Sequence, residues 1–427
     1  MNQGNRHLPP LALAWAIWGL GATLYFIGFY QRVAPAVLTD ELTREFALTA
    51  VGLGHLSAFY FYSYVAMQIP TGILADRLGP RRLLTAGAAV AALGTALFAF
   101  APNGIAANAG RMLVGASVGV AFVSMLKLAS VWLPARHFAL SSALAMAVGV
   151  SGAVFAGAPL RLMADQFGWR GVMGFSAALT ALLALATWAV VRDDPAMRGY
   201  ASHAPAAKAG HVPHVWADLK AALSDRNVVL LFFIPGTASA IVLTFAGLWG
   251  VPFLTTHYAM TPARAASLCS LMMVAWAVGS ILFSAASDRM GRRKPLFLGG
   301  LALTLMFWSL LIFVRGHSPV TLLLLVTATG FFAGCFIVSF AFAKESGPAH
   351  LAGTVSGIAN MGVIQGPMFM QPAVGWFLDR QWDGSLVAGK RVFAFAAYQQ
   401  GFSLMLVWGV ISLALLAMTR ETYCRQR

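Results

Sequence analysis

Residues 72–84 read Gly-Ile-Leu-Ala-Asp-Arg-Leu-Gly-Pro-Arg-Arg-Leu-Leu, and residues 284–296 read Ser-Ala-Ala-Ser-Asp-Arg-Met-Gly-Arg-Arg-Lys-Pro-Leu. The two stretches align at a constant offset of 212 residues, and the Asp, the Arg, the Gly, the second Arg and the final Leu match. Each stretch lies between two long apolar runs. A repeat at this spacing in an apolar chain indicates two homologous bundles of helices.

The matching residues have the chemistry of a turn at a membrane surface. Glycine allows a sharp turn, basic residues stay at the cytoplasmic face, and an Asp at a helix end can accept hydrogen bonds from a neighbouring helix N-terminus or from the following Arg. We therefore predict two conformational hinges that can hold one state closed; a positive anchor that only fixes topology is the alternative. The hinge residues are Asp76, Arg77, Gly79, Arg81, Asp288, Arg289, Gly291 and Arg293.

Composition identifies the class of protein. Hydrophobic residues make up 59% of the 427 residues and charged residues 10%, which excludes a soluble globule and indicates an integral membrane protein. The formal net charge is +15, but on the predicted topology 18 of the 29 Lys and Arg lie in cytoplasmic segments and eight in outer loops. This distribution follows the positive-inside rule, so we expect a lipid bilayer as partner and no nucleic acid. The three cysteines form neither a metal-binding spacing nor a disulfide pair.

The apolar runs predict about twelve spans, each able to cross roughly 30 Å of hydrocarbon. Their limits are 11–38, 50–74, 82–102, 105–131, 139–162, 170–191, 227–256, 262–286, 296–314, 319–343, 352–378 and 395–419. The predicted domains are a cytoplasmic N-terminus (1–10), a first six-helix bundle (11–191), a cytoplasmic linker (192–226), a second six-helix bundle (227–419) and a cytoplasmic tail (420–427).

The hinge motif resembles the loop between helices 2 and 3 of the major facilitator superfamily, which is repeated more weakly between helices 8 and 9. The resemblance implies an all-α integral membrane fold with twelve transmembrane helices in two pseudo-symmetric six-helix bundles. It also implies a monomer in the bacterial inner membrane that exposes a midplane site to each side in turn. The sequence contains no nucleotide-binding loop, metal cluster or catalytic triad, so we expect a transporter without cofactors rather than an enzyme.

Arg32 is the first predicted substrate-binding residue. It lies about 31 Å along the first helix, where a guanidinium must face a wet cavity or an anion unless it snorkels to the outer headgroups. The stretch 25–35 resembles the helix 1 element of the anion:cation symporter branch, in which the Arg holds a carboxylate or phosphate of the substrate. Gln31 stands where that element has an Asp, so one proton-coupling group of that branch is missing.

Three further residues of the first bundle are candidates for binding the substrate, and whether Arg32 and Arg111 share one cavity is left open. Tyr60 and Tyr64 lie at i and i+4 on one helix face, which is predicted to line the cavity; an interhelical packing stripe is the alternative. Arg111 opens an Arg-x-x-x-Gly-x-x-x-Gly pattern that resembles the helix 4 Arg of the same branch.

The second bundle offers amides instead of cations. Asn360 and Gln371 lie within about 20° of one helix face, whereas Gln365 lies off it. Amides in an apolar helix need partners, and hydrogen bonding to the substrate and interhelical bonding are both open to them. We include all three, together with Gln31, among the candidate substrate-binding residues.

The acidic residues limit the substrate class. All fourteen Asp and Glu are predicted in loops or at span ends, whereas an antiporter of cationic drugs usually needs a carboxylate inside the membrane. Two embedded arginines favour a secondary transporter of a small organic anion or zwitterion, such as a carboxylate or an amino acid. A drug or metabolite exporter of the same superfamily is the alternative, and His55 and Glu345 are the candidates for coupling to a co-transported proton.

Overall fold

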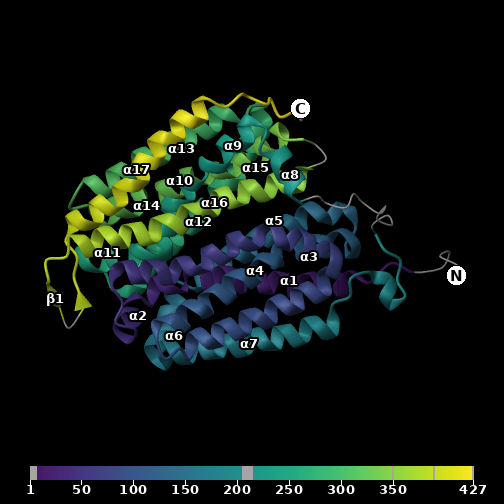
Figure 1. Ribbon diagram of the computed structural model, residues 1–427, viewed down its shortest axis with the longest axis horizontal. Coiled ribbons are helices and arrows are strands. Elements are labelled where there is room, and N and C mark those ends of the chain that lie inside the picture. The colour runs from purple at the N-terminus through teal and green to yellow at the C-terminus, as the bar shows by residue number, and fades with distance from the viewer. Residues whose placement is uncertain (1–6, 204–214, 349–350, 388–389, 426–427) are drawn as a thin grey trace.

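The computed structural model describes residues 7–203, 215–348, 351–387 and 390–425, and most of them are helical. The helices form two groups that lie side by side with their long axes roughly aligned (Figure 1). The start of the first helix and the end of the last one lie toward the same end of the molecule, below called the termini end. The opposite end, the hairpin end, carries the short antiparallel strands β1 (Leu386–Val387) and β2 (Lys390–Arg391).

The first group of helices is formed by the N-terminal half of the chain. In order, its elements are α1 (Leu11–Val33), η1 (Ala34–Val37), α2 (Thr39–Glu45), α3 (Ala50–Ala99), α4 (Gly104–Trp132), η2 (Ala135–His137), α5 (Phe138–Phe155), α6 (Ala158–Phe167) and α7 (Trp169–Val190). Two short elements, η3 (Pro195–Arg198) and α8 (Val215–Ala222), lie in the connection to the second group.

The second group is formed by the C-terminal half. Its elements are α9 (Arg226–Phe233), α10 (Gly236–Thr244), η4 (Phe245–Trp249), α11 (Gly250–His257), α12 (Pro262–Met290), α13 (Lys294–Phe313), α14 (Pro319–Ala333), η5 (Gly334–Ile337), α15 (Val338–Ser346), α16 (Ala352–Arg380) and α17 (Phe395–Ala417). The element η4 is one turn of π-helix, a feature that occurs frequently at functional sites.

Within the described residues, nine helices are long and apolar enough to cross a membrane, or ten if the bent pair of α5 and α6 forms one span. The predicted spans 50–74 and 352–378 correspond to the first part of α3 and to α16, which run beside the other helices but are not among those nine. The number of spans that meet this criterion is therefore smaller than the predicted twelve.

The predicted boundary between the spans 50–74 and 82–102 is present within α3, where two helices meet at a kink and Gly79 leaves helical geometry, at φ 76° and ψ 160°. A glycine adopts this positive φ without a steric penalty. The span 139–162 instead breaks after Phe155, where α5 and α6 meet at an angle of 41°.

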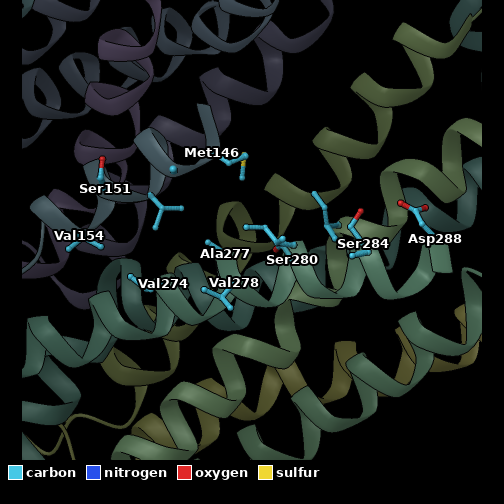
Figure 2. Close-up of a pocket in the computed structure, with 14 residues that line it drawn as sticks. Met146, Ser151, Val154, Val274, Ala277, Val278, Ser280, Ser284 and Asp288 are labelled. Carbon is cyan, nitrogen blue, oxygen red and sulfur yellow. The ribbon is translucent and has the colours of Figure 1, made fainter. Parts of the chain in front are cut away.

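The two groups of helices touch at the hairpin end and separate toward the termini end. At the hairpin end α3 packs closely on α16, and a Cβ atom on Gly54 would lie 2.6 Å from the Cα of Pro372. Toward the termini end, α5 and α12 enclose a cavity of about 770 Å³ (Figure 2). It extends from Val154 and Val274 to Asp288, the third residue from the end of α12.

Candidate functional site

Arg32 lies in the last turn of α1 and is surrounded by aromatic rings. Its guanidinium carbon is 4.4 Å from the ring centre of Phe29, 5.5 Å from that of Tyr60 and 5.3 Å from that of Tyr64. The residue is 5% exposed, and its Nε is buried without a hydrogen-bond partner. Among the described residues, no ion pair includes Arg32. The structure thus places a buried cation against the negative faces of aromatic rings, with no carboxylate paired to it.

Tyr60 and Tyr64 lie on one face of α3 beside this cation. Their rings are stacked, with centres 6.1 Å apart and planes 11° apart. The Tyr60 hydroxyl donates to the carbonyl of Gly28 in α1 at 3.0 Å. This bond fixes the Tyr60 ring relative to the helix that carries Arg32, so the cation and the two rings form one preorganised cluster.

Arg111 lies on the other side of this cluster and has different partners. Its guanidinium carbon is 5.3 Å from the Tyr60 ring centre, and its Nη1 donates to the carbonyl of Gln31 at 2.5 Å. In a helix that carbonyl would accept from residue 35, which is Pro35 and has no N–H. Weaker bonds of 3.4 Å go to the carbonyls of Leu56 and Ser57. Arg111 therefore joins α1 to α3 by satisfying backbone carbonyls.

Gln31 points away from the cation beside it. Its Nε2 donates to the hydroxyl of Thr95 at 3.2 Å, and the side chain is 1% exposed. The structure places this amide between α1 and the second part of α3, and it does not bring the amide together with the ring cluster around Arg32.

The amides of α16 lie against α9 and α10. The Nε2 of Gln371 donates to the carbonyl of Leu243 at 2.9 Å, next to the π-turn η4, while its Oε1 is buried without a partner. The Nε2 of Gln365 donates to the carbonyl of Phe232 at 2.5 Å, and Asn360 is half-buried. Because η4 also contacts α1 and η1, the Gln371 side chain lies in the part of the second group that faces the helix of Arg32.

The first hinge is fixed by an acid that follows α7. The Asp193 carboxylate accepts from the backbone N–H of Arg81 at 2.7 Å, and a Cβ on Gly79 would clash with it. The guanidinium of Arg81 donates to the Trp188 carbonyl and stacks 4.0 Å from the Trp188 ring centre. Arg77 is exposed, and the side chain of Asp76 lies outside the described part of the structure.

The second hinge has a charged network. Arg293 forms ion pairs of 2.6 Å with Asp288 and with Glu345, and it also donates to the Ser287 hydroxyl. Gly291 adopts the left-handed conformation at φ 65°, and Arg289 is exposed. The network holds the end of α12 against the end of α15.

Glu421 caps the helix that follows the second hinge. Its carboxylate accepts from the backbone N–H groups of Arg293 and Lys294 at 3.0 and 2.9 Å, and from those of Thr422 and Tyr423. Partial burial opposes ionisation, but these four bonds outweigh it and lower the pKa of Glu421 below its ordinary value of 4.5. The charged carboxylate therefore stabilises the start of α13.

We predict that Glu421→Gln lowers the melting temperature of the purified protein at pH 7 by about 2–4 °C. A carboxyl group with a lowered pKa stabilises the fold above its unfolded pKa, and this contribution is lost as the pH falls through the folded pKa. The difference in melting temperature between Glu421→Gln and the wild type should consequently become smaller at acidic pH. Melting curves between pH 7 and pH 3, with Glu45→Gln as control, would measure it; a constant difference at every pH would contradict the charged cap.

The two candidates for proton coupling lie away from the ring cluster. His55 is exposed, and its Nδ1 is 3.1 Å from the Tyr62 hydroxyl. Glu345 accepts from Arg293 and from the Thr422 hydroxyl in the second group of helices. The structure thus brings Arg32, Tyr60, Tyr64 and Arg111 together but not His55 or Glu345.

Residues 17–365 and 239–422 match, in two overlapping segments, the family model described as Major Facilitator Superfamily. The chain belongs to the major facilitator superfamily. It is 25% identical over 391 residues to a putative tartrate transporter of Agrobacterium vitis, covering 86% of this chain and 87% of that one. It is also 23% identical over 386 residues to a probable sulfoacetate transporter of Cupriavidus necator, with 85% and 87% covered. A probable galactarate/D-glucarate transporter of Escherichia coli is 21% identical over 370 residues, with 78% and 81% covered.

Solved structures have the same fold. A bacterial homologue of the human lysosomal transporter Spinster, in an inward-facing and unoccupied conformation, aligns with a TM-score of 0.73 at 15% identity, covering 96% of this chain and 97% of that one. A mutant of the nucleoside transporter NupG aligns with a TM-score of 0.71 at 15% identity, covering 95% and 100%. The predicted all-α major facilitator fold is confirmed, and this major facilitator is a multi-pass transporter and not an enzyme.

Three acidic residues bind backbone N–H groups of distant segments, and the sequence predicts no such role for them. Asp193 and Glu421 bind backbone N–H groups of the hinge residues Arg81 and Arg293, and Asp379 binds backbone N–H groups at the hairpin end. Arg161, which has no predicted role in the sequence, lies in α6 at 7% exposure and pairs with Glu41 and Asp165. No local motif identifies these partners, because each pairing except that of Arg161 with Asp165 connects distant parts of the chain.

Proposed function

We propose that this major facilitator is a secondary transporter that moves a small organic anion, or a zwitterion with a carboxylate, by alternating access. The observation that carries the proposal is the buried Arg32 guanidinium, which lies among aromatic rings with one N–H unpartnered and, among the residues that the structure describes, without an ion pair to a carboxylate. A buried charge without a counter-ion is costly in a protein. An anionic ligand would supply the missing partner.

The chemistry of the site favours one carboxylate or sulfonate bound by Arg32. A guanidinium has a planar fork of donors that matches two oxygens of such a group. The residue 212 positions later, Thr244, is uncharged, so the second bundle offers no equivalent cation. The unpartnered Oε1 of Gln371 would instead accept a hydrogen bond from a hydroxyl or ammonium group elsewhere on the solute.

The names of the relatives agree with this assignment. Tartrate, sulfoacetate, and galactarate or glucarate are all small organic anions, and each is named for a transporter that aligns with most of this chain. We therefore propose small organic anions as the substrate class of this protein and do not propose a particular compound.

The way in which the bundles meet supports the proposal of alternating access. Contact at the hairpin end, with a cavity of about 770 Å³ between α5 and α12 toward the termini end, corresponds to a state open to one side. We assign the termini end to the cytoplasm because most of the basic residues lie in the predicted loops on that side. Arg32, Tyr60 and Tyr64 are buried and do not line this cavity. Rocking of the bundles would expose their cluster to each side in turn.

A thermal-shift screen of the purified protein tests the ligand class. Organic acids, organic sulfonates, amino acids, neutral sugars and cationic drugs would be added at equal concentration. A ligand present at 100 times its Kd raises the free energy of unfolding of the protein by about 2.7 kcal/mol. We expect stabilisation by one or more anions. Stabilisation by cationic drugs alone would overturn the proposal.

A further inference from the structure

Asp379 connects the two bundles at the hairpin end. It is the second-last residue of α16 and faces the first turn of α3 in the other bundle. Its Oδ1 accepts from the backbone N–H of Ala50 at 2.9 Å, and its Oδ2 accepts from that of Val51 at 2.7 Å. Both carboxylate oxygens are thus bound to the N-terminus of a helix that belongs to the opposite bundle.

These bonds complete the capping of α3. The first four N–H groups of a helix have no partner within it. In α3 those of Gly52 and Leu53 bond to the side chain and the carbonyl of Thr49, and those of Ala50 and Val51 bond to Asp379. The negative charge also lies at the positive end of the helix dipole. The Ala50 and Val51 N–H groups are therefore bonded to the Asp379 carboxylate only while the bundles are in contact.

Small residues permit this contact. A Cβ added to Gly375 would clash with the Ala50 carbonyl, and one added to Gly54 would clash with Pro372. The backbones of α3 and α16 consequently approach too closely for a larger side chain at either position. A substitution at Gly375 offers a way to separate the bundles without changing any charge.

Asp379 has a second partner within its own bundle. The Nη1 of Arg391, in strand β2, lies 3.2 Å from Oδ1, and the Arg391 guanidinium packs 4.3 Å from the ring centre of Trp382. The side chains of Arg391 and Asp379 are 31% and 20% exposed. Arg391 would stay with Asp379 if α16 moved away from α3, because both residues belong to the second bundle.

We propose that Asp379 is a latch that holds the hairpin end closed, and that Arg391 retains the carboxylate when the bundles separate. On opening, the Ala50 and Val51 N–H groups pass to water, while the carboxylate keeps an ionic partner. Substitutions of Asp379 and Arg391 should therefore shift the equilibrium between the closed and the open hairpin end in opposite directions. Loss of Asp379 removes the bonds to Ala50 and Val51, which are made only in the closed state. Loss of Arg391 removes an ion pair that is already present in the closed state, but only in the open state does it leave the carboxylate without any of these partners.

Distances between two spin labels across the hairpin end test this latch without any substrate. The labels would be attached at Arg44→Cys in α2 and Val320→Cys in α14, both exposed positions, in a Cys424→Ser background. The other two cysteines are buried. Asp379→Asn should raise the ratio of long to short distances about tenfold, as expected for lost hydrogen bonds to a charged group. Arg391→Gln should lower that ratio.

Two further variants complete the test. Gly375→Leu should raise the long-distance population as Asp379→Asn does, because it separates the same helices sterically. Asp383→Asn is the matched control, since Asp383 bonds to Ser385 in its own loop and, among the described residues, to no group of the other bundle. It should leave the distances unchanged. An unchanged distance distribution in Asp379→Asn would overturn the latch. So would an increase in the long-distance population of Arg391→Gln or Asp383→Asn as large as that expected for Asp379→Asn. Because no transport is measured, either result is independent of the proposed substrate.

Discussion

Arg32→Lys should weaken binding of the transported anion about tenfold or more, on the order of 1.4 kcal/mol. Lysine keeps the positive charge but lacks the planar fork that binds two oxygens together. It also packs less well against the ring of Phe29, which lies 4.4 Å from the guanidinium carbon. Arg32→Ala should nearly abolish uptake. Binding to the purified protein, measured by calorimetry with an anion found in the thermal-shift screen, gives the affinity directly.

The control for this experiment is Arg44→Lys, which changes an exposed arginine of the same bundle and should leave the affinity unaltered. Size-exclusion profiles would show that the Arg32 variants remain folded and monodisperse. Unchanged affinity in Arg32→Ala would mean that the buried cation serves packing and not binding.

Arg111→Met should mainly destabilise the protein. The substitution leaves the Gln31 carbonyl without its 2.5 Å donor, and the backbone cannot replace that donor because residue 35 is proline. A buried acceptor left unsatisfied costs about 1–3 kcal/mol. Two weaker bonds to Leu56 and Ser57 are lost as well. We expect the melting temperature to fall by roughly 5 °C or more.

The affinity of the folded fraction of Arg111→Met separates a structural role from a binding one. Because Arg111 is bonded to backbone carbonyls, we expect the Kd for the anion to change by less than about threefold. Arg111→Lys should recover part of the stability through the bond to the Gln31 carbonyl. A large loss of affinity at unchanged melting temperature would instead assign Arg111 to the substrate.

The repeated hinge motif predicts the architecture because the residues that form each turn are neighbours in the sequence. Gly79 and Gly291, found by sequence repetition alone, both have positive φ in the structure. Tyr60 and Tyr64 lie on one face because a helix brings residues i and i+4 together. Helical spacing, turn residues and apolar length are all properties of short segments, so they can be recognised in a single sequence.

Partners across the fold could not be predicted in the same way. Asp193, Glu421 and Asp379 bind N–H groups 112, 128 and 329 positions away, whereas the sequence predicts only ordinary loop or span-end acids at these positions. The prediction that Gln31 lies in the site is wrong, because its side chain bonds to Thr95. One signal was available: Pro35 leaves the Gln31 carbonyl without its helical donor, so a buried donor from another helix was needed there.

The most direct test of the central claim is counterflow in liposomes that contain the purified protein. The liposomes would be loaded with an unlabelled organic acid, placed in the labelled acid without a pH gradient, and compared with liposomes containing Arg32→Ala. We predict rapid entry of the labelled anion in the wild type, competition by other small organic anions, and almost no entry in the variant. Exchange of a cationic or neutral solute that Arg32→Ala leaves intact, with no exchange of any organic anion, would contradict the account.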